Sequence, residues 1–218
     1  TKVPEDFLWA AGELAAMGYQ TVNLNLGCPS GTVVAKGKGS GMLADSSALD
    51  AFLDAVFSRA PCAVSVKTRL GLSDPEEFGP LLEIYNHYPL AELIVHPRVQ
   101  KDGYRHPVRL EAFAPILAAS RHPVCFNGGL VTAGDCARFQ VRYPAVERVM
   151  IGQGLLANPA LAGGVAGGIL FGLLTVFELD RACRSRVDML MDAAVSPLCM
   201  ALVRLLALLA GAALAAGL

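Results

Sequence analysis

The stretch most able to do chemistry is residues 21–31, Thr-Val-Asn-Leu-Asn-Leu-Gly-Cys-Pro-Ser-Gly. Apolar and polar residues alternate up to Leu26, which predicts a strand with one apolar face. Gly27 permits a tight exit from that strand, and Pro29 fixes the backbone just beyond it. Cys28 is therefore expected on a loop at the carboxyl end of a strand, where α/β proteins keep their reactive groups. A glycine-dense basic loop, Lys36-Gly-Lys-Gly-Ser-Gly41, follows at once.

Polar residues or glycines also close every later strand that the sequence predicts. A cation or an imidazole at such a position can hold an anion or exchange a proton, and a glycine lets the backbone approach a ligand closely. In chain order the strand-end residues are Asn25 and Cys28, Lys67 and Arg69, His96 and Arg98, Asn127 and Gly128, and Gly152 and Gln153.

The elements that must position these residues alternate between helices and strands. Ser46 and Ser47 are candidate N-caps of a helix, and Ser73-Asp-Pro-Glu-Glu77 combines a capping residue, a first-turn proline and acids that the helix dipole favours. The sequence predicts helices at 4–17, 46–58, from 73 onward, 110–119 and 132–139, and strands at 21–26, 62–69, 92–96, 123–127 and 147–151.

Strands separated by helices require parallel pairing with right-handed crossovers, so the chain belongs to the α/β class. Two architectures are open, a doubly wound sheet and a (β/α)-barrel. A doubly wound sheet would gather its polar residues at one switch point, whereas polar residues at every strand end suit a ring of loops around one ligand. We therefore favour a barrel of the (β/α)8 TIM type. It must be incomplete, with about five C-terminal βα units, because five strands cannot close an eight-stranded barrel.

Bulk composition limits the classes of function. The 218 residues carry a formal net charge of −1, so binding to nucleic acid would have to come from local clusters of cations. The six cysteines form no CxxC pair and the four histidines are scattered, so no metal site is expected. We recognise no signal peptide and expect a reduced, cytoplasmic protein with mostly buried thiols.

Five motifs, in order, resemble those of the tRNA-dihydrouridine synthases. They are Asn-Leu-Gly-Cys-Pro at 25–29, Val-Lys-Thr-Arg-Leu-Gly at 66–71, Val-His-Pro-Arg at 95–98, Asn-Gly-Gly at 127–129 and Met-Ile-Gly-Gln-Gly at 150–154. The resemblance covers about residues 4–161. It implies an FMN-dependent (β/α)8 barrel followed by a small helical domain that helps to hold tRNA. It also implies that NADPH reduces the flavin, which delivers a hydride to a tRNA uridine, while a cysteine on a mobile loop supplies the proton.

The resemblance assigns roles to three of the strand-end residues. Cys28 becomes the proton donor, and an ordinary cysteine, which is mostly a thiol at neutral pH, is suited to that role. Lys67 becomes the cation beside the flavin edge that turns anionic on reduction. His96 is expected to donate to the flavin edge or to contact the base, with the flavin side favoured.

The glycine motifs of the resemblance are expected to hold the FMN phosphate. Backbone amides at a helix start bind a dianion, and glycine allows close approach. At Gly129 the family usually has an acid, and at Gln153 it usually has an arginine. The residues expected at the phosphate are Asn127, Gly128, Gly129, Gly152 and Gln153.

The expected tRNA contacts lie mainly on the loops that follow the strands. Phosphate binding needs clusters of cations, and an aromatic ring such as Tyr104 can stack on or pack near a base. The expected contacts are Asn25, Lys36, Lys38, Arg69, Arg98, Lys101, Tyr104 and Arg105, with Arg109 as a further cation.

The two ends of the chain differ from a complete enzyme of this family. The family's first three barrel strands have no counterpart before Thr1, so residues 1–161 are expected to form a partial FMN-binding barrel. Residues 162–218 are expected to form an apolar helical tail. Leu198–Leu218 holds one charge, Arg204, and is long enough to span a bilayer. Its alanine content makes it weakly hydrophobic, so a packed or frame-shifted tail is favoured over a membrane span.

Three functions are compatible with these residues. The first is the reduction of tRNA uridine to 5,6-dihydrouridine with FMN and NADPH. The second is another FMN barrel that reduces a free pyrimidine or an enoate, similar to dihydroorotate dehydrogenase. The third is an inactive fragment that binds RNA or nothing. The basic loop at 36–38 and the Asn-Leu-Gly-Cys-Pro motif favour the first.

Overall fold

The computed structural model describes residues 1–159 and 161. The apolar tail expected at 162–218, with Leu198–Leu218 inside it, lies outside these residues. None of the helices in the described part of the chain is long and apolar enough to cross a membrane.

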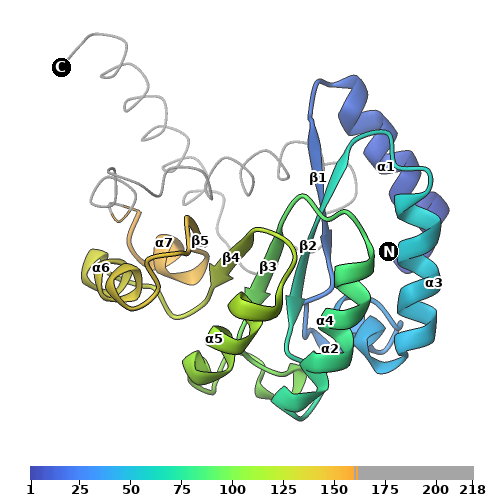
Figure 1. Cartoon of the computed structure of the whole chain (residues 1–218). Coiled ribbons are helices and arrows are strands. Elements are labelled where there is room, and N and C mark those ends of the chain that lie inside the picture. Colours follow the sequence, from blue (N-terminus) through green and yellow to red (C-terminus); the bar gives the residue numbers. More distant parts are fainter. Residues whose placement is uncertain (160, 162–218) are drawn as a thin grey trace, which may run out of the picture. The chain divides into compact units, whose positions relative to one another are not determined.

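Five parallel strands form one sheet in which each strand pairs with its neighbour in the chain, in the order β1-β2-β3-β4-β5. They are β1 (Thr21–Asn25), β2 (Ala63–Arg69), β3 (Leu93–His96), β4 (Val124–Asn127) and β5 (Arg148–Met150). A doubly wound sheet would reverse its strand order at a switch point. This sheet does not reverse (Figure 1), and the expected incomplete (β/α)8 architecture is confirmed.

The helix before β1 and the longer helices between the strands lie where the sequence predicts them, to within a few residues. They are α1 (Pro4–Ala16), α3 (Ser46–Phe57), α4 (Phe78–His87), α5 (Leu110–Ala119) and α6 (Ala133–Arg142). Several short helical turns in the loops have no counterpart among the predicted elements. They are α2 (Gly31–Val34), η1 (Gly39–Ala44), η3 (Gln100–Asp102) and α7 (Gln153–Ala157), whereas η2 (Pro75–Glu77) lies inside the helix predicted from 73 onward.

The helix caps correct one prediction and confirm another. Asp45, and neither Ser46 nor Ser47, is the N-cap of α3, and its carboxylate accepts a hydrogen bond of 2.9 Å from the amide of Ala48. The cap lies one residue earlier because an aspartate accepts from the first-turn amides and also interacts favourably with the helix dipole. The expected helix start at 73–77 is present, with Asp74 as its cap and Pro75 in its first turn.

A cluster of aromatic rings joins α5 and α6 to the sheet. The ring of Phe113 in α5 lies 5.0 Å from that of Phe126 in β4, 5.9 Å from that of Phe139 in α6 and 5.3 Å from that of Tyr143, measured between centroids. Phe113 itself is fully buried. The cluster therefore fixes α5 and α6 against β4, whose carboxyl end carries Asn127.

Replacing Phe113 with alanine should lower the free energy of unfolding by about 3–5 kcal/mol, because three rings would border the cavity that remains. Val141→Ala, at a side chain of α6 that is 85% exposed, is the control and should change it by less than about 0.5 kcal/mol. Urea denaturation followed by circular dichroism measures both variants. Equal effects of the two substitutions would contradict the packing described.

Candidate functional site

The sheet register brings the strand-end residues together at one edge. Asn25 lies opposite Lys67 on the neighbouring strand, and Arg69 lies opposite His96. Asn127 in turn lies opposite Met150 of β5. Since all the strands are parallel, their carboxyl ends share this edge. Side chains spread over 125 residues of sequence thus become neighbours.

Cys28 lies half-buried on the loop after β1, and the glycine-dense segment packs directly against it. Ser40 donates two hydrogen bonds to the carbonyl oxygen of Cys28, from its amide at 3.0 Å and from its hydroxyl at 2.8 Å. Gly39 has a φ of +56°, and a Cβ there would lie 2.8 Å from the same oxygen. The loop therefore needs glycine at this position to approach Cys28 so closely. Asn25 also shapes the strand exit, because its side-chain oxygen accepts from the amide of Gly27 at 2.9 Å.

Lys67 is a cation without a partner at the centre of this edge. It makes no hydrogen bond or ion pair with any described residue. Burial, together with repulsion by Arg69, lowers the pKa of Lys67 to about 8. The anionic forms of Cys125 and Cys28 act in the opposite direction and favour its charged state. At neutral pH the ammonium therefore stays charged and is suited to bind an anion.

His96 is the middle of a chain of hydrogen bonds. Asn127 donates its side-chain N–H to the carbonyl of Met150 at 2.8 Å, which leaves its oxygen facing His96 Nδ1 at 3.1 Å. Arg98 donates to His96 Nε2 at 3.2 Å. Because Arg98 can only donate, Nε2 is the acceptor and Nδ1 carries the proton. Burial and the nearby cations Lys67, Arg69 and Arg98 lower the pKa of His96 to about 3, so the ring is neutral.

This arrangement bears on the role expected for His96, which stays a prediction. Both of its ring nitrogens already have protein partners, so it has no free N–H to donate to a flavin edge in this geometry. A neutral, doubly held imidazole instead offers a fixed surface at the strand ends.

Two of the expected tRNA contacts have buried side chains. Arg69 is 2% exposed, and its nitrogens donate to the carbonyls of Gly27 and Val99 at 2.9 Å each. Arg98 is 8% exposed and holds His96. In this structure both arginines hold other parts of the site. Their contact with tRNA stays a prediction.

Three other expected contacts line a pocket beside the Cys28 loop. The pocket has a volume of about 500 Å³, and one of its walls is formed by Pro29 and Ser30. The other wall is the loop between β3 and α5, with Gln100, Lys101, Asp102, Gly103, Tyr104 and Arg105. Tyr104 is 57% exposed, and Lys101 and Arg105 are exposed as well. Of the basic loop residues, Lys36 is exposed and Lys38 is half-buried.

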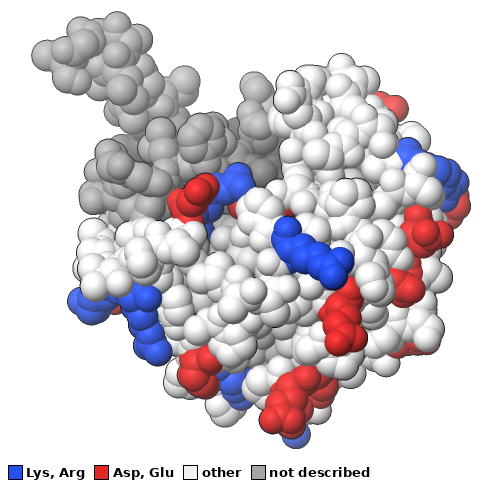
Figure 2. Space-filling view, in the orientation of Figure 1, with Lys and Arg blue, Asp and Glu red and all other residues white. Residues whose placement is uncertain are grey.

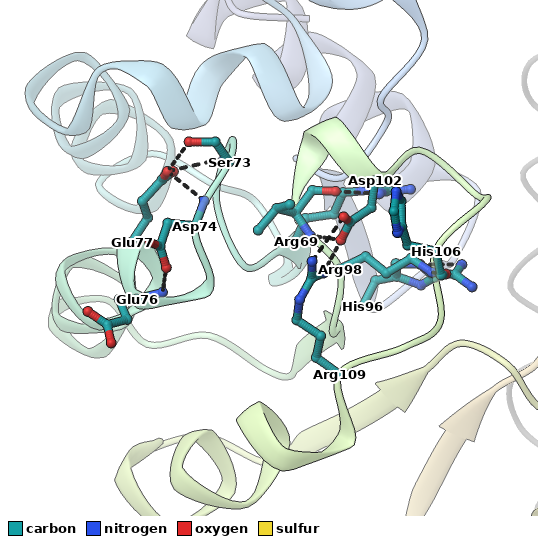
Figure 3. Close-up of polar contacts among 11 residues, drawn as sticks. Arg69, Ser73, Asp74, Glu76, Glu77, His96, Arg98, Asp102, His106 and Arg109 are labelled. Atoms are coloured by element: carbon teal, nitrogen blue, oxygen red, sulfur yellow. Dashed lines mark hydrogen bonds and ion pairs between the residues drawn. The ribbon is translucent and has the colours of Figure 1, made fainter.

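An ion pair that the sequence did not predict holds this second wall. Arg109 donates to both carboxylate oxygens of Asp102, with Nη2 to Oδ1 at 3.0 Å, and Asp102 also accepts from the amide of Val99 at 2.9 Å. Arg109 holds the pKa of Asp102 below its usual range, and Asp102 raises that of Arg109. Figure 3 shows the two side chains facing each other beside Arg69 and Arg98. The Asp102-Gly103 turn was the available signal in the sequence.

The predicted phosphate residues lie at the ends of β4 and β5. Gly128 and Gly129 have φ values of +136° and +70°, and Cβ atoms there would lie within 3.1 Å of His96 and 2.7 Å of Val108 respectively. The positive φ values and the lack of space for a Cβ therefore explain why both positions are glycine. Gly152 differs, because a Cβ there would meet nothing within 4 Å. There is thus room beside Gly152, which immediately precedes α7, and Gln153 next to it is exposed.

These residues fit a phosphate-bearing, anionic cofactor such as FMN. The unpaired Lys67 ammonium would supply positive charge to such a group, and there is free space beside Gly152. Within residues 1–159 and 161, no group of three or more His, Cys, Asp or Glu side chains could hold a metal ion. On the face that Figure 2 shows, acidic and basic side chains are interspersed and form no broad patch of one sign.

Gly39→Ala should loosen the loop against Cys28, because the new Cβ would collide with the Cys28 carbonyl and the left-handed backbone would be strained. We expect the Cys28 thiol to react with iodoacetamide several-fold faster, as measured by mass spectrometry of its peptide. Gly31→Ala is the matched control in the same segment, since a Cβ there meets nothing within 4 Å. An unchanged rate in Gly39→Ala would mean that this contact does not restrain Cys28.

Lys67→Met should reveal the cost of the buried charge through its pH dependence. Below pH 8 Lys67 is charged in both the folded and the unfolded protein. Between pH 8 and 10.5 it is neutral in the folded protein and still charged in the unfolded one, and above pH 10.5 it is neutral in both. The gain in unfolding free energy over the wild type should therefore be about 1–3 kcal/mol at pH 7 and smaller at pH 9.5. Urea denaturation at both values measures it, with the exposed Lys36→Met as control. A gain that is independent of pH would contradict the assignment.

Comparison with known proteins identifies the family. The family described as "Dihydrouridine synthase (Dus)" matches residues 1–191. The "tRNA-dihydrouridine(16) synthase" of Ralstonia nicotianae is 33% identical over 166 residues, which are 75% of this chain and 51% of that protein. The protein of the same name from Cupriavidus necator is 32% identical, with the same coverage. The "Probable tRNA-dihydrouridine synthase 1" of a Synechocystis species is 30% identical over 74% of this chain and 46% of its own length.

The chain thus spans about half the length of these relatives. The family match nevertheless covers well over half of the 218 residues and includes every strand of the sheet. The chain belongs to the dihydrouridine synthase family.

Proposed function

We propose that this chain carries part of the active site for the flavin-dependent reduction of uridine to 5,6-dihydrouridine in tRNA. The observation that carries the proposal is the meeting of a restrained, half-exposed Cys28 with an unpaired Lys67 at one sheet edge. The relatives named above, all tRNA-dihydrouridine synthases by name, support tRNA as the substrate.

FMN, reduced by NADPH, would supply a hydride to one carbon of the uracil 5,6 double bond. Cys28 would give the proton to the neighbouring carbon, so that its S–H bond breaks and a C–H bond forms. The thiolate that remains would be stabilised by Lys67, because the two charges interact across the site. The same ammonium is placed to favour negative charge on a bound ring.

The pocket next to Cys28 supports a nucleic-acid substrate over a free pyrimidine. Lys101 and Arg105 lie in the same wall as the exposed ring of Tyr104. Cations near an aromatic ring suit a nucleotide, whose phosphates need charge and whose base can stack. A free pyrimidine carries no phosphate for these cations to bind.

Flavin binding is the first test. The purified chain, mixed with FMN and freed of excess cofactor, should keep a flavin absorbance near 450 nm, and Lys67→Met should weaken that binding. A folded chain that retains no FMN would contradict the proposed site.

Cys28→Ala should separate proton transfer from flavin chemistry. In the flavin-bound protein we expect uridine reduction in unmodified tRNA to be lost, while NADPH oxidation continues, since the thiol gives its proton only to the base. Cys62→Ala, at a half-buried cysteine next to the amino end of β2, is the matched control and should retain reduction. Full reduction by Cys28→Ala would remove Cys28 from the role of acid.

A further inference from the structure

We propose that Arg69 is a positioning residue that ties the Cys28 loop to the loop carrying Tyr104, and so sets the geometry between the two walls of the pocket. The inference rests on the proposed function only where it relates this geometry to catalysis. The contacts of Arg69 do not depend on that function.

Arg69 holds the Cys28 loop through its Nε atom. This nitrogen donates to the carbonyl oxygen of Gly27 at 2.9 Å. The carbonyl of Gly27 and the amide of Cys28 belong to one planar peptide unit. The hydrogen bond therefore fixes the orientation of the peptide that leads into Cys28. Ser40 holds the carbonyl on the other side of the same residue, so Cys28 is restrained from both ends.

Arg69 holds the opposite wall through a second nitrogen and through its planar face. Its Nη1 donates to the carbonyl of Val99 at 2.9 Å, and its Cζ lies 5.3 Å from the centroid of the Tyr104 ring. The second contact is a cation–π interaction. Val99 immediately precedes the pocket wall, which begins at Gln100, and Asp102 accepts from the Val99 amide. Arg109 in turn binds Asp102. Hydrogen bonds therefore connect Gly27, through Arg69 and Val99, to Asp102 in the opposite wall.

The burial of Arg69 supports this role. It is 2% exposed, and the acceptors of its hydrogen bonds are neutral carbonyls. Burial lowers its pKa, which shows that the charge has a cost here. A lysine would provide a single nitrogen, whereas the guanidinium presents donors in fixed, diverging directions and a flat face for a ring. The position therefore needs arginine for its geometry, which a simple positive charge would not supply.

The test compares Arg69→Lys, Tyr104→Leu and the double variant by the alkylation rate of Cys28, measured by peptide mass spectrometry. Arg69→Lys should raise this rate several-fold, while Cys62 in the same molecule should be unchanged. Tyr104→Leu should also raise it, although Tyr104 lies on the other loop, and should add little in the Arg69→Lys background, because both changes break one connection. Arg59→Lys, at an exposed arginine, is the control.

Equal acceleration of Cys28 and Cys62 in Arg69→Lys would indicate general loosening and overturn the proposal, as would no change at Cys28. If Arg69→Lys fails to fold, Tyr104→Leu decides alone, since an exposed side chain is removed. An unchanged Cys28 rate there also overturns the proposal. The readout needs neither flavin nor tRNA. A chain that never reduces uridine would contradict the proposed function but would leave this result standing.

Discussion

Parallel pairing of the strands in unbroken chain order is the constraint on which the rest of the structure depends. It sends every carboxyl end to one edge, so that each crossover adds one more polar residue to the same place. The register then decides the neighbours, with Lys67 beside Asn25 and Arg69 beside His96. A shift of one residue would turn these side chains to the opposite face of the sheet. The apolar packing of the strands thus also fixes the chemistry at their ends.

The electrostatic character of the edge follows from how few carboxylates reach it. Lys67, Arg69 and Arg98 are gathered around the neutral ring of His96, and Asp102 is the carboxylate that offsets them within the described residues. Because Asp102 is already bound by Arg109, the excess of positive charge remains at the strand ends. Such a site favours an anionic ligand, even though the chain as a whole carries a net charge of −1.

Periodicity predicts the elements of this fold well, because alternation and helical spacing are local properties. The five strands lie within two residues of their predicted bounds. The roles of Arg69 and His96 could not be predicted, because they depend on carbonyls and rings that come from distant loops. From its residue type alone, Arg69 was expected to contact tRNA. In the folded protein its side chain is buried and connects the carbonyls of Gly27 and Val99. The close packing of Gly39 against Cys28 could not be predicted either, because it also depends on how the loop folds back.

The hydrogen bonds of His96 limit how the proposed reaction could begin again. Its Nδ1 proton is directed to Asn127, whose own amide ends at the Met150 carbonyl, so the chain stops at a backbone group that cannot supply a proton. After each reduction the spent thiolate of Cys28 would need a new proton. Since Cys28 is half-exposed on its loop, bulk water can return that proton once the product has left. Regeneration of the acid would then be coupled to product release.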